Sequence, residues 1–273
     1  MPQALAMSPA AKPVLRSEVT RVRDINMHAR VAIEPGTEDR TPVVLIHGFV
    51  LASRVMAPSG QFLARDFPVY APDLPGFGES DKPPVQTLDQ LTEWIEAWLE
   101  ARGIARAAFI GNSMGCELII NLAVAHPHRI ARIVLQGPSV DPPARSYDGM
   151  AGRLMKNMIK ERSSALNEIA REDYARATIP RVVKTAFMTF RDEPEKKLPK
   201  ISAPVLVVRA GNDPVISQEW AERCASIVPD GRLIVIPGYC HTIHFIAPEV
   251  FTDAIRPFLL EGQRELRVAA SLG

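Results

Sequence analysis

Three residues that lie far apart in the sequence, Ser113, Asp213 and His241, are of the types that together perform nucleophilic acyl transfer. A serine hydroxyl attacks a carbonyl well only when a base removes its proton, and a neutral imidazole is suited to that task. A carboxylate beside the imidazole holds it in the required tautomer and stabilises the cation that forms. We therefore expect Ser113 as nucleophile, His241 as general base and Asp213 as orienting acid in the hydrolysis of a carboxylic ester or related acyl bond.

Ser113 stands at the centre of a G-x-S-x-G pattern, residues 111–115 (GNSMG). The pattern follows a predicted strand at 107–110 and opens a predicted helix at 114–126, which is the setting this motif requires. A sharp strand-to-helix turn strains the serine backbone and crowds its neighbours, and glycines relieve that crowding because they lack Cβ. The simpler interpretation is a serine that caps a helix between two packing glycines.

An oxyanion site is expected beside this serine. Residues 47–49 (HGF) come directly after a predicted buried strand at 43–46. Acyl transfer builds negative charge on the former carbonyl oxygen, and preorganised N–H groups stabilise it. We assign these donors to the backbone N–H groups of Phe49 and Met114, and expect His47 to brace the loop through a hydrogen bond.

The acid and the base each follow a predicted strand. Asp213 comes after 205–208 and His241 after 233–236, so both fall beyond carboxyl ends of strands, where open α/β sheets place their sites. The chain order Ser, Asp, His is the order used by this architecture. Next to a glycine and an asparagine, Asp213 equally suits a turn. Asp141 is the alternative acid.

His244 is the rival base, three residues beyond His241. The spacing of the two histidines could also indicate a metal pair, but no further cluster of ligands accompanies it, so no metal is expected. No motif indicates another cofactor. Cys116 and Cys240 are interpreted as packing residues.

The elements that must hold these residues alternate between short apolar strands and amphipathic helices. That alternation predicts a parallel sheet with helices on both faces. The alternation stops at 137–138 (GP), and the following stretch is helix-prone, without a convincing strand, up to about residue 199. The predicted organisation is a flexible segment at 1–16, a core at 17–137 and 200–262, a helical cap at 138–199 and a tail at 263–273.

The cap is expected to cover the Ser113 pocket. Its methionine and phenylalanine side chains suggest an apolar, adaptable lining. The residues predicted to line the pocket are Met150, Met155, Phe187 and Met188.

Composition limits the remaining function classes. The 273 residues carry a net charge of +1, which gives no general attraction to nucleic acid or anionic membranes. No apolar run reaches the length of a membrane span, and the first residues lack a signal-peptide pattern. Three widely spaced cysteines fit a reducing compartment. We expect a cytoplasmic protein, monomeric or homodimeric, acting on a small-molecule acyl or aryl ester.

Taken together, HGF at 47–49, PDLPGFGESDKP at 72–83, GNSMG at 111–115, GND at 211–213 and PGYCH at 237–241 resemble the α/β-hydrolase superfamily, in its subgroup with a helical cap. The resemblance covers about residues 43–260. It implies an α/β-hydrolase fold: an eight-stranded, mostly parallel sheet flanked by helices, with the cap inserted after strand six.

The resemblance leaves more than one activity open. Ser113 disfavours haloalkane dehalogenases and epoxide hydrolases, which use an aspartate nucleophile. The GNSMG turn is similar to that of carbon–carbon hydrolases of aromatic ring-cleavage products, but Thr242 stands where those enzymes usually have tryptophan. Carboxylesterase or lipase-like activity is favoured. A ligand receptor on the same fold is the alternative from another class.

Overall fold

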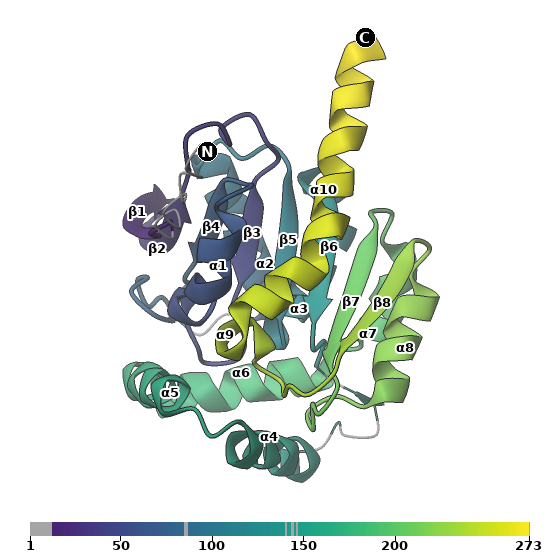
Figure 1. The fold of residues 1–273 in the computed structure, drawn as a ribbon. Coiled ribbons are helices and arrows are strands. Elements are labelled where there is room, and N and C mark those ends of the chain that lie inside the picture. The colour runs from purple at the N-terminus through teal and green to yellow at the C-terminus, as the bar shows by residue number, and fades with distance from the viewer. Residues whose placement is uncertain (1–12, 85–86, 140, 143–144, 146, 273) are drawn as a thin grey trace, which may run out of the picture.

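The computed structural model describes residues 13–272 except 85–86, 140, 143–144 and 146. Eight strands form one sheet in the order β1-β2-β4-β3-β5-β6-β7-β8 (Figure 1). The β1–β2 and β2–β4 pairs are antiparallel and all the other pairs are parallel. The strands are β1 (Arg16–Val22), β2 (Ile25–Ala32), β3 (Val43–Ile46), β4 (Val69–Pro72), β5 (Ala107–Asn112), β6 (Ile130–Gln136), β7 (Val205–Ala210) and β8 (Gly231–Ile236). The predicted eight-stranded, mostly parallel sheet is confirmed.

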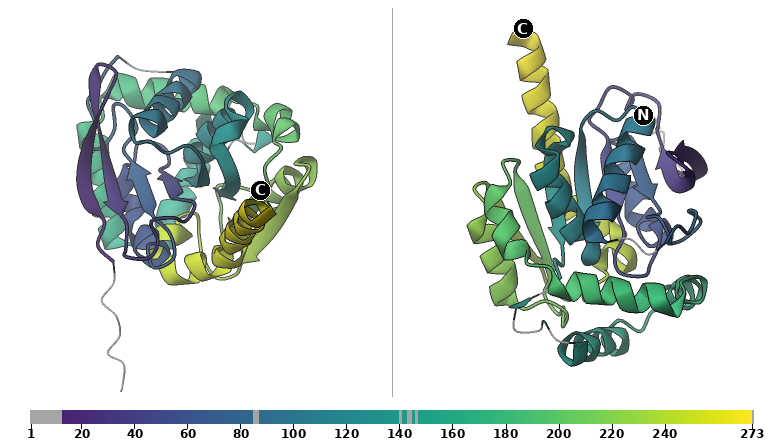
Figure 2. Two further views of the ribbon diagram at one scale, coloured as in Figure 1. Left: turned by 90° about the horizontal axis from the view of Figure 1, so that it is seen from above. Right: turned by 180° about the vertical axis from the view of Figure 1, so that it is seen from behind.

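Helices cover both faces of this sheet, as the two further views show (Figure 2). One face packs against α2 (Leu88–Ala101), α3 (Met114–Ala125) and α8 (Gln218–Ile227). The opposite face packs against α1 (Ala57–Leu63) and α10 (Pro248–Leu272), with the short α9 (Ile243–Ile246) beside them.

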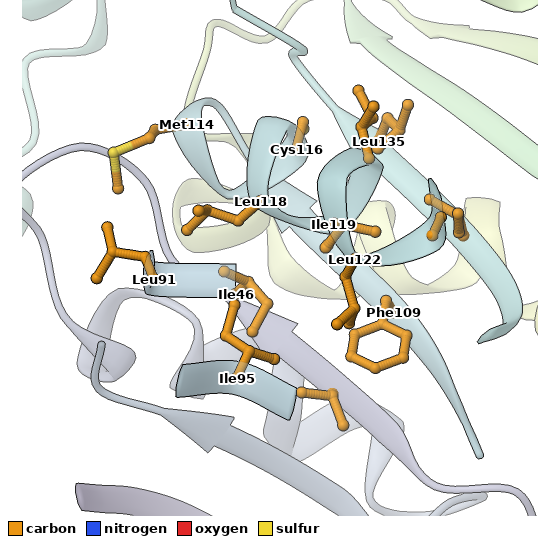
Figure 3. Packing of buried hydrophobic residues seen from close by; sticks show 14 of the residues in the cluster. Ile46, Leu91, Ile95, Phe109, Met114, Cys116, Leu118, Ile119, Leu122 and Leu135 are labelled. Atoms are coloured by element: carbon orange, nitrogen blue, oxygen red, sulfur yellow. The ribbon is translucent and has the colours of Figure 1, made fainter. Parts of the chain in front are cut away.

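Alternate residues of each central strand enter opposite core layers, because successive side chains of a strand point to opposite faces. In β3, Val44 and Ile46 belong to the layer under α2 and α3, whereas Val43 and Leu45 belong to the layer under α1 and α10. Figure 3 shows part of the first layer, with side chains of α3 facing Phe109 of β5. Strands buried on both faces explain why these segments appear in the sequence as continuous apolar runs.

The described residues between β6 and β7 form four α-helices, and the first three of them gather at one end of the sheet (Figure 1). The four helices are α4 (Tyr147–Glu161), α5 (Ser164–Arg176), α6 (Ile179–Arg191) and α7 (Pro194–Lys197). No described residue between β6 and β7 belongs to a strand. Polar contacts fasten these helices to the core: Arg54 forms an ion pair with Asp173 at 2.7 Å, and Arg153 donates to the main-chain oxygen of Val215 at 2.9 Å.

The two ends of the chain differ from expectation where they are described. Residues 1–12 of the segment predicted to be flexible lie outside the described part, but Leu15 is buried and Arg16 begins β1, where it pairs with Val31. At the other end, α10 continues to Leu272, through residues 263–272 of the predicted tail. Residues 263–272 are mostly good helix formers and contain no proline. Across the described ranges, no helix has both the length and the apolarity to cross a bilayer.

Candidate active site

Ser113 occupies a strained turn between β5 and α3. Its backbone has φ 53° and ψ −123°, in the left-handed half of the map that residues with a side chain rarely adopt. A Cβ on Gly115 would lie 2.4 Å from the carbonyl oxygen of Ile46, so only glycine lets this turn approach β3 so closely. The Ser113 hydroxyl caps no helix N–H and instead lines a pocket. The capping interpretation of this serine is therefore wrong.

The loop at 47–49 lies against the same turn. A Cβ built on Gly48 would be 3.3 Å from Cβ of Ser113. Nε2 of His47 accepts a hydrogen bond from the N–H of Leu74 at 3.1 Å, which leaves Nδ1 to donate to the carbonyl oxygen of Gly48 at 2.9 Å. Burial lowers the pKa of His47, so its ring braces the loop in the neutral form.

The expected oxyanion donors flank the serine. Met114 is the first residue of α3, so the helix itself offers its N–H no acceptor. Phe49 lines the pocket together with Ser113. Among the described residues, neither N–H donates a hydrogen bond within the protein, so both stay candidates for the oxyanion role.

Asp213 and His241 form a buried pair at the ends of β7 and β8. Nδ1 of His241 lies 2.8 Å from Oδ2 of Asp213, and the other carboxylate oxygen accepts the N–H of Val215 at 2.7 Å. Burial opposes protonation of His241, but the charge and hydrogen bond of Asp213, with the charge of Glu161, outweigh it and raise the pKa. Nε2 of His241 has no hydrogen-bond partner among the described residues, and His241 lines the same pocket as Ser113.

The alternatives to this pair lie elsewhere. Asp141 is engaged by Arg153, not by a histidine. Nδ1 of His244 contacts Oε1 of Gln136 at 2.8 Å, and burial, together with the charge of His241, lowers the pKa of His244 to about 3. No group of three or more potential metal ligands exists among the described residues.

Gln136 at the end of β6 connects the parts of the site, a role that its sequence position did not suggest. Its main-chain oxygen accepts the N–H of Ser113 at 3.1 Å, and its side-chain Nε2 donates to the main-chain oxygen of His241 at 2.8 Å. Oε1 accepts from Nδ2 of Asn112 at 2.5 Å. The side chain is fully buried, so each lost hydrogen bond would leave an unsatisfied polar group.

Gly137, the next residue, lies directly against the acid–base pair. A Cβ there would be 2.7 Å from Cε1 of His241 and 2.9 Å from Nδ1, and the backbone has φ +60°. The sequence marked this glycine only as the end of the alternating pattern. Because Gly137 has no side chain, the imidazole of His241 can occupy this position.

Gly137→Ala is expected to lower ester hydrolysis about a hundredfold, because a ring displaced by about an ångström loses its catalytic alignment. Initial rates with p-nitrophenyl acetate and thermal unfolding of the same samples measure the effect. The matched control is Gly152→Ala in α4, where an added Cβ meets nothing within 4 Å. A Gly137→Ala protein with the control's activity would contradict the predicted crowding.

The pocket has a volume of about 440 Å³ and lies between the Ser113 turn and the helices α4 and α5. Helix α4 contributes residues spaced i, i+3, i+4 and i+7, which share one helix face. The lining residues are Gly48, Phe49, Leu51, Asn112, Ser113, Leu154, Asn157, Met158, Glu161, Leu166, Asn167, Ala170, Arg171, Tyr174, His241 and Thr242.

The four cap residues predicted to line this pocket lie elsewhere, so that prediction is corrected. Met150 is buried in the core and Met188 packs against it. Met155 is 57% exposed because it lies on the outer face of α4. Phe187 is 40% exposed, with the guanidinium of Arg191 3.9 Å from its ring centre. Composition identified the cap as apolar, but helix rotation determines which apolar residues face the site.

Comparison with known proteins gives matches along almost the whole chain. The model of the α/β-hydrolase fold family matches residues 41–182, and a family described as TAP-like protein matches residues 183–270. Esterase YbfF of Escherichia coli is 23% identical over 254 residues, covering 86% of this chain and 98% of the relative.

Two further relatives broaden this picture. The 2-hydroxy-6-oxo-6-(2'-aminophenyl)hexa-2,4-dienoic acid hydrolase of Metapseudomonas resinovorans is 27% identical over 260 residues, covering 84% of this chain and 87% of the relative. The crystal structure of the enol-lactonase from Burkholderia xenovorans superposes with a TM-score of 0.75 at 21% identity, covering 89% of this chain and 100% of that one. At that identity the structural likeness concerns the fold alone.

Proposed function

The chain belongs to the α/β-hydrolase family, and we propose that it is a serine hydrolase that cleaves carboxylic esters through an acyl-enzyme on Ser113. One observation carries the proposal. The buried His241 is held by Asp213 at 2.8 Å, its other ring nitrogen has no hydrogen-bond partner among the described residues, and His241 and Ser113 line the same pocket. Similarity to an esterase and to other hydrolases supports the same class of reaction.

In the proposed reaction, Nε2 of His241 takes the Ser113 hydroxyl proton as the serine oxygen attacks the ester carbonyl. The N–H groups of Phe49 and Met114 bind the oxyanion. The tetrahedral intermediate then expels the alcohol, which receives the proton from His241. Water, deprotonated by His241, attacks the acyl-enzyme and releases the carboxylic acid and the free serine. Asp213 stabilises the imidazolium throughout.

The pocket favours an acyl or aryl ester of small to medium size. Most of the surface that bounds its 440 Å³ is apolar, with side chains such as Leu51, Leu154 and Leu166 contributing. We propose that residues 138–199 form the cap and that residues 17–137 and 200–262, which contain almost all of the sheet and of the helices on its two faces, form the core. The second candidate is carbon–carbon hydrolysis of a ring-cleavage dienone, favoured by the similarity to the hydrolase of Metapseudomonas resinovorans.

A panel of p-nitrophenyl esters from acetate to decanoate, with a lactone and a ring-cleavage dienone, tests the proposal. We expect steady turnover of the short esters, with release of one acid for each alcohol. Turnover of the dienone without any ester would favour the second candidate. Binding accompanied by at most a few slow cycles would indicate a receptor.

A further inference from the structure

Two side chains of the cap reach the loop that carries His241. Oδ1 of Asn157 accepts the main-chain N–H of His241 at 3.1 Å, and Oε1 of Glu161 accepts the N–H of Thr242 at 2.5 Å. The two side chains also bind each other, because Nδ2 of Asn157 donates to Oε2 of Glu161 at 2.8 Å. They lie four residues apart and therefore on one face of α4, which is the face that lines the pocket.

These contacts supply the hydrogen-bond acceptors that the core does not offer to the loop that carries His241. The core holds the carbonyl side of His241 through Gln136, but the two successive N–H groups of the loop have their acceptors in the cap. Asn157 is only 6% exposed, so water cannot easily replace it. A buried N–H without an acceptor is costly, and the loop would shift to find one.

We propose that Asn157 and Glu161 are positioning residues that let the cap hold His241 in its working place, so that the active site is complete only when α4 is docked. This inference rests on the proposed esterase function and deepens it. The cap then does more than cover the substrate, because it orients the general base.

Charge adds a second effect of the same contact. The charged and titratable groups around His241 are Asp213 from the loop after β7, Glu161 from α4, His244 from α9 and the adjacent Cys240, and Arg171 of α5 lines the same pocket. Both carboxylates favour the imidazolium, which also forms in the transition state. Removing the Glu161 charge should therefore lower the pKa of His241 and shift the acidic limb of the rate profile to lower pH.

The test uses the rate of labelling by a small fluorophosphonate, measured against pH, because this probe reports nucleophile activation with little use of the pocket. Asn157→Ala and Glu161→Ala are expected to lower the maximal labelling rate about tenfold through misplacement of the base. Glu161→Gln keeps an acceptor for Thr242, so it should recover most of that rate while its acidic limb lies at lower pH. Lys156→Ala, on the exposed side of α4, is the matched control.

The outcomes are distinguishable. Variants that unfold at the wild-type temperature and label at the wild-type rate, with an unmoved acidic limb, would overturn the positioning role alone. Variants that change only the KM for long esters would also overturn it, because that result would show that Asn157 and Glu161 contact the substrate without positioning His241. A wild-type protein that the probe never labels would overturn the proposed esterase function and this inference with it. Should the alanine variants fail to fold, the pH profile of Glu161→Gln tests the proposal instead. An acidic limb at lower pH than in the wild type would support it, and an unmoved limb would overturn it.

Discussion

Ser113→Ala is expected to abolish fluorophosphonate labelling and to lower ester turnover about ten-thousandfold or more, because no acyl-enzyme can form without the serine oxygen. The remaining rate would come from the oxyanion donors and from binding. Mass spectrometry of the labelled protein and initial rates with p-nitrophenyl acetate provide the two measurements. Alanine fills the same turn with one atom fewer, so the fold should persist.

The thiol nearest to Ser113 along α3 is not suited to replace that serine. Cys116 lies within one helical turn, but it is fully buried, and burial raises the pKa of its thiol far above the ordinary value. Ser226→Ala, on the exposed side of α8, serves as the matched control and should label like the wild type. Labelling that survives Ser113→Ala would move the nucleophile to another residue.

His241→Gln is expected to lower the labelling rate by about three orders of magnitude or more, because glutamine can donate to Asp213 but cannot accept the serine proton. We prefer glutamine to alanine because alanine would leave Oδ2 of the buried Asp213 carboxylate without its hydrogen-bond partner and would also destabilise the fold. Labelling kinetics and thermal unfolding, measured together, separate the two effects.

His244→Gln is the control for this change. His244 is buried and uncharged at neutral pH, and its ring contacts Gln136 rather than a carboxylate. Its replacement should cost stability but retain most of the labelling rate. If instead His244→Gln abolished labelling and His241→Gln did not, the general base would have to be reassigned. In the wild type, the rate should rise through an acidic limb above the ordinary histidine pKa, because the pKa of His241 is raised.

Much of the fold and the outline of the site could be predicted from the sequence because their signals are local. Residues 43–46 form a continuous apolar run because a strand covered on both faces needs apolar side chains in both directions. The glycines around Ser113 are required by the turn itself, so the G-x-S-x-G pattern and the position of the helix behind it could be recognised together. The start of α2 is likewise marked by a local signal, the capping box, which spans only the four residues from Thr87 to Gln90.

Contacts between distant segments were decided only by the tertiary structure. Asp213 and Asp141 are both carboxylates after strands, and only the packing of β7 beside β8 places Asp213 against His241 while Arg153 takes Asp141. Three further contacts of the His241 loop also involve residues dozens of positions away in the sequence. Gly137 leaves room for the imidazole, Gln136 donates a hydrogen bond to the loop, and Asn157 and Glu161 accept hydrogen bonds from it.

The sequence by itself thus determined which residues are of the types that the proposed chemistry needs and which strands and helices carry them, since strand pattern, turn glycines and helix caps depend on neighbours along the chain. The tertiary structure decided which side chains meet and which cap residues face the pocket. The physical reason is that a helix such as α4 can present any of its faces to the core, and its rotation follows from packing against partners that local sequence does not specify.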